Sequence, residues 1–118
     1  MIRVKRVYEP AEATDGYRVL VDRLWPRGLR KEAARVDLWL KEIAPSNELR
    51  KWYHHDPAQW EEFQQRYGAE LRDHEDLVAL LRTKAREGDL TLLFSSREAV
   101  RNNAAALKAY LEKKTPSR

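Results

Sequence analysis

Tyr17-Arg18-Val19-Leu20-Val21 is a nearly continuous apolar run in the first quarter of the chain. Such a run, with β-branched residues, is typical of a strand buried on both faces of a sheet. Residues 90–94 form a second run of this kind, bounded by turn residues on both sides. Helical patterns lie between the two runs, and the sequence therefore predicts a compact α/β fold with a small, mainly parallel sheet packed with helices.

A further strand is predicted over residues 2–7, where Ile2, Val4 and Val7 are interspersed with basic residues. This pattern is typical of a strand with one face toward the core, and it favours a place at the edge of the sheet. The link to the strand at 17–21 has about nine residues, whereas a parallel crossover usually needs a dozen or more. We therefore expect a mainly parallel sheet and leave the orientation of this first strand open.

The middle of the chain contains several signals for helices. Asp37 is expected to cap a short helix that ends at Pro45, and Asn47 is expected to start another turn. Asp56 followed by Pro57 is the clearest helix start, because Asp caps helices and Pro suits the first helical position. The expected apolar positions of these segments are Trp39, Leu40, Ile43, Leu49, Trp52, Trp60, Phe63, Tyr67 and Leu71.

Two more helices are predicted in the second half of the chain. The first carries Leu77, Leu80 and Leu81 and ends at Gly88, where a left-handed cap would fit. The last helix is expected to follow Ser96 directly, so that its free N–H groups point toward the ends of the strands. Its apolar face is expected to consist of Val100, Ala104, Leu107 and Leu111.

The length and composition restrict the classes of protein. The chain has 118 residues, the size of one domain, and we expect a single domain over residues 1–112 with a frayed, basic tail over 113–118. Cysteine is absent, which excludes disulfides, thiolate nucleophiles and sulfur-ligated metal sites. Residues 1–6 carry charges where a signal peptide needs an apolar core, and no run approaches the roughly 20 apolar residues of a membrane span. The expected location is the cytoplasm, whereas the oligomeric state is not specified.

Much of the positive charge lies in one segment. Lys and Arg total 23 against 19 Asp and Glu, a net charge of +4, and residues 23–35 contain five basic side chains and one acidic one. Such a segment is either a site for an anionic partner or a solvated basic loop. The 4 tryptophans lie near these cations in the sequence. They either pack in the core, which we favour, or stack on nucleic-acid bases.

Two polar clusters follow the two buried strands. They are Asp22, Arg23 and Arg27 after the first strand, and Ser95, Ser96 and Arg97 after the second. Ligands bind at the carboxyl ends of the strands in open α/β sheets, where the loops face helix N-termini. Hydroxyls, guanidiniums and N–H groups suit a phosphate or a carboxylate. We therefore predict a site for a small anionic ligand, in which Asp22 is the candidate acid or base.

Alternatives remain open at each of these residues. Ser95 or Ser96 could simply cap the following helix, and Asp22 could pair with an arginine. Asn102 and Asn103 are expected in the first turns of the last helix. They either take part in ligand binding or are exposed helical residues.

Other catalytic patterns are not found in the sequence. His54 is either a general base near the clusters or a structural histidine ahead of the next helix. No metal site is predicted, because neighbouring His54 and His55 project in different directions and no second ligand pair stands at helical spacing. The chain has no glycine-rich phosphate loop and no nucleophile elbow, so no cofactor is specified and enzymatic activity stays open.

Several motifs resemble one known family over most of the chain. They are Val21-Asp22-Arg23-Leu24-Trp25-Pro26-Arg27-Gly28, the segments 39–46 and 49–53, His55-Asp56-Pro57 and the segment 63–67. The chain is thereby similar to the YeaO-like branch of the domain-of-unknown-function 488 family, and the first of these motifs is quite specific. The resemblance implies a compact bacterial domain with a Rossmann-like core. It implies no activity, because the family is uncharacterised.

The chain departs from this family at its second polar cluster. Longer relatives carry Cys-Ala-Glu and then Cys-His-Arg where this chain has Ser95-Ser96-Arg97-Glu98 and then Arg101-Asn102-Asn103. Thiol- or histidine-dependent chemistry of those relatives is therefore not expected here. The compact branch usually has a Lys-Asp pair near residues 97–98 and a His where this chain has Arg101.

The leading functional hypothesis is a protein, enzymatic or not, that binds a small anionic ligand between the two polar clusters. The first alternative is a nucleic-acid-binding module that uses the basic, Trp-rich segment, and the second is an interaction or scaffold protein. Salt separates the first two, because binding to a nucleic-acid backbone weakens steeply as salt rises and binding of one anion does not. An exposed apolar patch would indicate the third.

Overall fold

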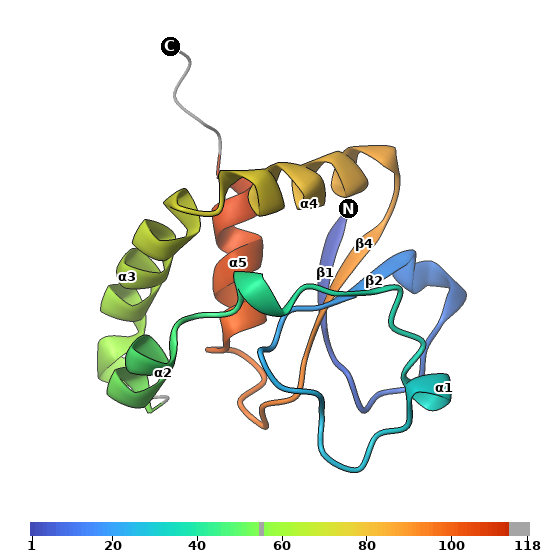
Figure 1. Ribbon diagram of the computed structural model, residues 1–118, viewed down its shortest axis with the longest axis horizontal. Helices are drawn as coiled ribbons and strands as arrows, with labels where there is room; N and C mark the ends of the chain where they lie inside the picture. The colour runs from blue at the N-terminus through green and yellow to red at the C-terminus, as the bar shows by residue number, and fades with distance from the viewer. Residues whose placement is uncertain (55, 114–118) are drawn as a thin grey trace.

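The sheet has four parallel strands in the order β1–β4–β2–β3, in a computed structural model that describes residues 1–54 and 56–113 (Figure 1). The strands are β1 (Ile2–Arg6), β2 (Tyr17–Leu20), β3 (Leu38–Trp39) and β4 (Leu90–Phe94). Every pairing in the sheet is parallel. The predicted α/β fold with a mainly parallel sheet is therefore confirmed.

The first strand lies at the edge of the sheet, as its alternating pattern predicted, and runs parallel to β4. Its link to β2 contains only the short 3₁₀ helix Ala13–Asp15. An extended link of this length still reaches back along a five-residue strand, because each extended residue spans about 3.3 Å. A crossover without a long helix is therefore sufficient here.

The strands end together at one edge of the sheet. Leu90 of β4 is the register partner of both Ile2 in β1 and Tyr17 in β2. Parallel strands that begin level also end level, since each residue advances by about 3.3 Å. The chain therefore leaves β2 and β4 at neighbouring positions, after Leu20 and Phe94.

Side chains on the two faces of the sheet enter two different cores. Val19 and Leu92 face the larger core, whereas Leu20 and Leu93 face a smaller one. The alternation follows from the pleat of a strand, which directs successive side chains to opposite faces. The runs predicted as buried on both faces are therefore strands with a core on each side.

Helices cover the larger core. They are α2 (Asn47–Tyr53), α3 (Trp60–Arg72), α4 (Glu75–Glu87) and α5 (Asn103–Glu112). Figure 1 shows these helices on the side of the molecule away from the short helix α1 (Lys31–Ala34). Phe63, Tyr67 and Leu71 of α3 are buried, as their helical spacing predicted.

The smaller core lies beneath the segment that follows β2. Trp25, Leu29, Val36 and Trp39 pack there against the sheet, and the rings of Trp25 and Trp39 meet edge to face at 5.5 Å between centroids. Gly28 in this segment has φ 75°, a left-handed conformation that glycine adopts at low energetic cost. These two tryptophans are half-buried and pack against the smaller core, the role favoured from the sequence.

The predicted helix from Asp37 to Pro45 is wrong. Leu38 and Trp39 instead form β3 beside β2, and only Lys41–Ile43 make a single 3₁₀ turn. The carboxylate of Asp37 accepts a hydrogen bond from the backbone N–H of Arg18 at 2.8 Å instead of capping a helix. Pairing with the open edge of β2 thus overrides the local cap signal.

The predicted start of the last helix is also wrong, because α5 begins at Asn103 and not after Ser96. Asn102 is the cap, and its side chain accepts a hydrogen bond from the N–H of Ala105 at 2.8 Å. Before it, the side chains of Ser96 and Glu98 accept hydrogen bonds from backbone N–H groups of the same segment. Such local bonds compete with helix formation, and Val100 is 66% exposed instead of core-facing.

Helix α4 differs from its prediction in detail. Leu81 is buried as expected, but Val78 fills the neighbouring core position while Leu80 is 36% exposed. Gly88 follows the helix with φ 171° and is therefore extended, not left-handed.

Apart from Lys113, the predicted tail lies outside the described residues, and so does His55. Within the described part of the chain, no helix is long and apolar enough to cross a membrane.

Candidate functional site

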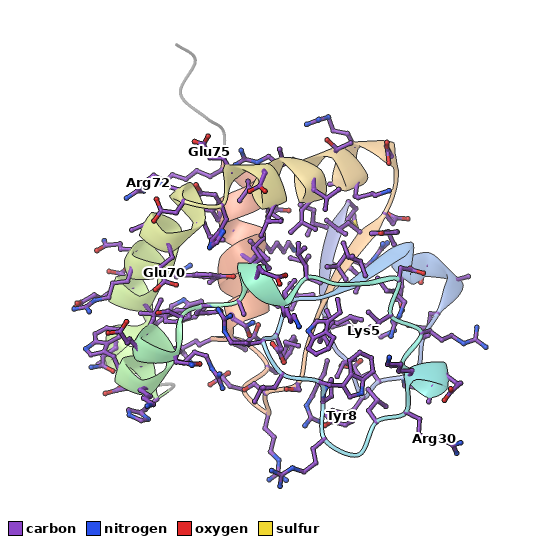
Figure 2. All side chains as sticks on the ribbon, viewed as in Figure 1. Lys5, Tyr8, Arg30, Glu70, Arg72 and Glu75 are labelled. Atoms are coloured by element: carbon purple, nitrogen blue, oxygen red, sulfur yellow. The ribbon has the colours of Figure 1, made fainter. Side chains whose placement is uncertain are left out.

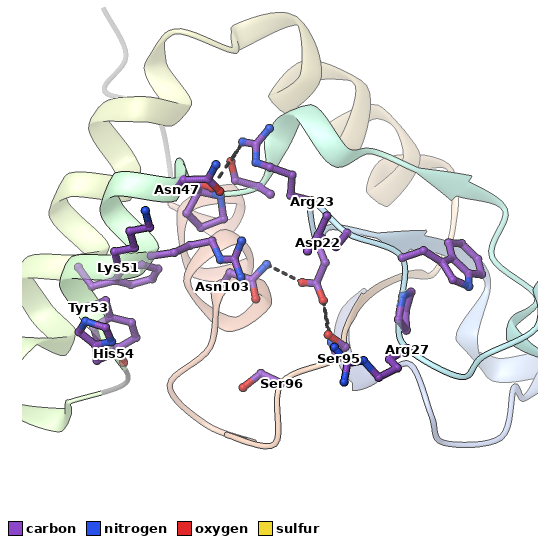
Figure 3. A pocket seen from close by; sticks show the side chains of 17 residues that line it. Asp22, Arg23, Arg27, Asn47, Lys51, Tyr53, His54, Ser95, Ser96 and Asn103 are labelled. Atoms are coloured by element: carbon purple, nitrogen blue, oxygen red, sulfur yellow. Dashed lines mark hydrogen bonds between the residues drawn. The ribbon is translucent and has the colours of Figure 1, made fainter.

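A cleft of about 690 Å³ opens where β2 and β4 end (Figure 3). The segment after β2 forms one wall and α2 forms the other. Ser95, Ser96 and Asn103 lie between the walls, and they come from the chain that follows β4 and from the start of α5. The strand ends that the sequence predicted to be neighbours are therefore neighbours.

Asp22 lies at the centre of the site and joins its parts. One oxygen, Oδ2, accepts hydrogen bonds from the backbone N–H and the hydroxyl of Ser95, at 2.9 and 2.8 Å. The other, Oδ1, accepts a hydrogen bond from the side-chain amide of Asn103 at 3.0 Å, and that amide also donates to the carbonyl of Val21. Figure 3 shows Asp22 between these two partners. Its carboxylate therefore ties the ends of β2 and β4 to the start of α5.

Arg23 is fixed against the other wall of the cleft. Its Nη2 donates to the carbonyl oxygens of Ala44 and Pro45, at 3.1 and 3.4 Å. Its Nε is buried and has no hydrogen-bond partner among the described residues. A buried donor without a partner costs free energy.

Arg27 is exposed on the segment after β2. Its backbone carbonyl accepts a hydrogen bond from the hydroxyl of Tyr8 at 2.8 Å, and the guanidinium of Arg6 lies over the ring of Tyr8, 4.7 Å from its centroid. Figure 2 shows Tyr8 in this part of the molecule. These contacts fix the backbone at Arg27 while leaving its side chain at the cleft.

The opposite wall carries residues that the sequence analysis did not place in the site. They are Asn47, Arg50, Lys51 and Tyr53, all on α2. His54, one of whose two predicted roles was a general base near the clusters, follows the helix directly and also lines the cleft. The polar residues Asn47, Arg50, Lys51 and His54 have the spacing i, i+3, i+4 and i+7, which brings side chains to one face of a helix. This periodicity is the signal that could have identified them.

Helix α2 is held in place by a cap and by the neighbouring helix α3. The hydroxyl of Ser46 accepts a hydrogen bond from the N–H of Leu49 at 3.1 Å. Glu70 of α3 (Figure 2) accepts two hydrogen bonds from Ser46, one from its N–H at 2.9 Å and one from its hydroxyl at 2.6 Å. The pair fixes the start of the helix that presents Arg50 and Lys51 to the cleft.

Tyr53 anchors the other end of α2. Its ring stacks on Phe63 at 4.2 Å between centroids, and its hydroxyl donates to the carbonyl of Arg101 at 3.1 Å. Burial is the main reason that the pKa of Tyr53 lies above its usual value of 10.0, so the phenol is neutral near pH 7. This side chain therefore contributes a rigid, uncharged part of the wall.

The electrostatic character of the cleft is positive. Four side chains that are cationic at neutral pH line it, with one carboxylate, that of Asp22. The four are Arg23, Arg27, Arg50 and Lys51, and in the described part of the chain none of them belongs to a salt bridge. The cleft thus concentrates an excess of three positive charges that protein carboxylates do not neutralise.

Two residues predicted for the site lie elsewhere. Arg97 is exposed and does not line the cleft. Asn102 is fully buried, and besides capping α5 its amide donates to the carbonyl of Glu98 at 2.9 Å. Neither Ser95 nor Ser96 caps α5, and the described partners of Asp22 are Ser95 and Asn103 instead of an arginine. Among residues 1–54 and 56–113, no group of His, Asp and Glu side chains is arranged to hold a metal ion.

Comparisons with known proteins place the chain in one family. Residues 1–118 match the family described as "Inactive DUF488-N3 subclade". The chain is 47% identical over 110 residues to "Uncharacterized protein YeaO" of Escherichia coli, covering 93% of this chain and 96% of that protein. It is 46% identical over 110 residues to "Uncharacterized protein Rv3073c" of Mycobacterium tuberculosis, covering 93% of this chain and 92% of the relative. No solved structure gives a significant match.

Proposed function

The chain belongs to the DUF488 family, in its YeaO-like branch, and we propose that it binds a small anionic ligand, bearing phosphate or carboxylate groups, in the cleft at the ends of β2 and β4. One observation carries the proposal: four cationic side chains without a salt-bridge partner among the described residues line a single cleft. Some cationic side chains elsewhere are paired, as Lys5 and Arg18 are with Asp15, and others are not. What distinguishes the four is that they line one cleft.

An anion offsets the cost of gathering these charges. Like charges repel one another more strongly in a cleft with low-dielectric walls than in open water. Guanidinium groups form short, charge-assisted hydrogen bonds with phosphate and carboxylate oxygens. Arg23 lines the same cleft, and Ser95, Ser96 and Asn103 add uncharged polar groups to its lining.

We infer that the protein binds the anion without converting it chemically. The matching family is described as inactive, and the chain contains no cysteine. Both oxygens of Asp22 already accept hydrogen bonds, three in all, from Ser95 and Asn103. A carboxylate used in this way positions the strand ends, and it is less available as a general acid or base.

The test is isothermal titration of the protein with inorganic phosphate and with citrate, in a buffer that contains neither. We expect saturable binding at one site. Arg27→Ala should weaken it about tenfold or more, because a charge-assisted hydrogen bond contributes about 1.5–3 kcal/mol. Arg30→Ala is the matched control, since Arg30 is also exposed but projects outward beside α1 (Figure 2) and does not line the cleft.

The same pair of variants tests the nucleic-acid alternative. Arg27 and Arg30 both lie in the basic segment 23–35, so binding of an oligonucleotide along that segment should weaken in both variants and decline steeply with salt. Of these two arginines, only Arg27 should affect the binding of one anion in the cleft. Equal losses in the two variants, or no binding of any small anion, would contradict the proposed function.

A further inference from the structure

The two walls of the cleft differ in chemical character. The α2 wall is polar and cationic, with Arg50, Lys51 and His54. The wall after β2 places the apolar residues Leu24, Trp25 and Pro26 between Arg23 and Arg27. Figure 3 shows Lys51 and His54 on one side of the site and Arg27 on the other, with Asp22 and Asn103 between them.

The size of the cleft exceeds the needs of a single small anion. Its volume of about 690 Å³ lies within the range of roughly 300–1,000 Å³ typical of pockets for organic ligands. Inorganic phosphate would contact one group of cations and leave most of the lining in water. The volume therefore favours a ligand with an organic part.

The charge of the cleft favours more than one phosphoryl group. The lining has three positive charges in excess, whereas one phosphate monoester carries about −1.5 to −2 at pH 7. Two linked phosphoryl groups match this excess more closely, and they are long enough to contact cations from more than one part of the lining.

The apolar wall indicates where the organic part lies. Leu24 is 69% exposed although it lines a cleft, and water around its side chain costs free energy that a ligand surface would remove. The ring of Trp25 beside it is held by a hydrogen bond from its Nε1 to the carbonyl of Leu29 at 2.6 Å and by the edge contact with Trp39. A rigid indole of this kind is suited to contact with a planar ring.

From these features, and resting on the proposed function, we propose that the ligand is a nucleoside diphosphate. Its diphosphate lies among the four cationic side chains of the lining, and its planar base lies against Leu24 and Trp25. Inorganic diphosphate would contact only the cationic part of the lining, and a nucleoside without phosphate would contact only the apolar part.

Titration calorimetry with phosphate, diphosphate, ADP, UDP and adenosine tests this assignment. We expect ADP and UDP to bind at least about tenfold more tightly than diphosphate, because burying a base against apolar side chains adds more than about 1.4 kcal/mol. Diphosphate should in turn bind more tightly than phosphate, and adenosine should bind weakest.

Two variants separate the two parts of the lining. Leu24→Ser should weaken ADP about fivefold and leave diphosphate unchanged, because it removes apolar contact without removing charge. Arg50→Ala should weaken both about tenfold. Leu24 is largely exposed, so its replacement leaves the fold intact, which thermal unfolding checks.

The outcomes distinguish this assignment from the proposal beneath it. If ADP and UDP bind no more tightly than diphosphate, or if Leu24→Ser weakens both ligands equally, the nucleoside diphosphate is the wrong ligand class, while anion binding in the cleft stands. If none of the phosphates binds, the proposed function itself fails.

Discussion

Asp22 and Ser95, 73 residues apart in the sequence, are joined by two hydrogen bonds to a single carboxylate oxygen, one from the backbone N–H at 2.9 Å and one from the hydroxyl at 2.8 Å. The bonds connect the end of β2 to the end of β4 directly beside the cleft. This contact holds together the two segments that carry Asp22, Arg23, Arg27, Ser95 and Ser96, the predicted residues that line the cleft.

Removing this carboxylate should destabilise the fold. Asp22→Ala leaves the N–H and the hydroxyl of Ser95 without their acceptor and removes one of the two acceptors of the Asn103 amide. We expect the free energy of unfolding to fall by about 2–3 kcal/mol. Urea denaturation followed by circular dichroism measures the loss. Asp73→Ala is the control, because Asp73 is exposed after α3, and it should change stability by less than about 0.5 kcal/mol. Equal stabilities of the two variants would mean that Asp22 does not tie the strands together.

The ionisation of Asp15 should make stability depend on acid pH. Burial alone raises the pKa of this carboxyl, but hydrogen bonds from the Glu12 backbone, Lys5 and Arg18 outweigh it and hold the pKa below the usual value of 3.8. A carboxyl with a lowered folded-state pKa contributes stability above its unfolded-state pKa, and it loses that contribution as the pH falls through the folded-state value. We therefore expect the wild type to lose this contribution progressively below about pH 4.

Asp15→Asn isolates this contribution from those of other carboxyl groups. The difference in unfolding free energy between wild type and variant should be largest near neutral pH and should shrink toward pH 2, as measured by urea denaturation across this range. Glu112→Gln is the control, since Glu112 is exposed in α5 and should leave the pH profile unchanged. A difference that stays constant with pH would show that the charge of Asp15 does not stabilise the fold.

The contact between Ser46 and Glu70 should affect both stability and ligand binding. Glu70→Ala removes the acceptor of two hydrogen bonds at the start of α2, and we expect a loss of about 1–2 kcal/mol in unfolding free energy. Because α2 presents Arg50 and Lys51 to the cleft, anion affinity should fall severalfold although Glu70 does not line it. Glu61→Ala, at an exposed position of the same helix α3, is the control for both measurements. If the anion affinity of Glu70→Ala is unchanged, the hydrogen bonds between Ser46 and Glu70 do not position the cationic side chains of α2.

Two glycines with similar backbone conformations should respond differently to alanine. Gly16 has φ 67° and Gly28 has φ 75°, so a Cβ atom is unfavourable at both. At Gly16 the added atom would lie 2.2 Å from the carbonyl oxygen of Asp89, whereas at Gly28 nothing lies within 4 Å. We expect Gly28→Ala to cost about 1 kcal/mol through backbone strain and Gly16→Ala to cost more than about 3 kcal/mol, in thermal or urea unfolding. Similar losses would show that the β1–β2 link shifts to accommodate the methyl group.

Elements with strong local signals could be predicted from the sequence. The apolar runs at 17–21 and 90–94 became β2 and β4, and Asp56 with Pro57 marked the 3₁₀ turn that leads into α3. The segment from Asp37 to Pro45 could not be predicted, because its outcome depends on a free edge of β2 that is far away in the sequence. The start of α5 was misplaced since Ser96 and Glu98 bind N–H groups that a longer helix would have used.

The amino-acid sequence alone determined which polar residues directly follow the two buried strands. They are Asp22, Arg23 and Arg27 after the first strand and Ser95 and Ser96 after the second. Tertiary structure decided which other residues join them. The contribution of α2 and the exclusion of Arg97 depend on where Glu70 and Tyr53 anchor that helix, and on how the segment before α5 folds. Helical and strand periodicities are local properties of the chain, whereas the cleft arises from contacts between distant segments, which only packing of the whole domain can bring together.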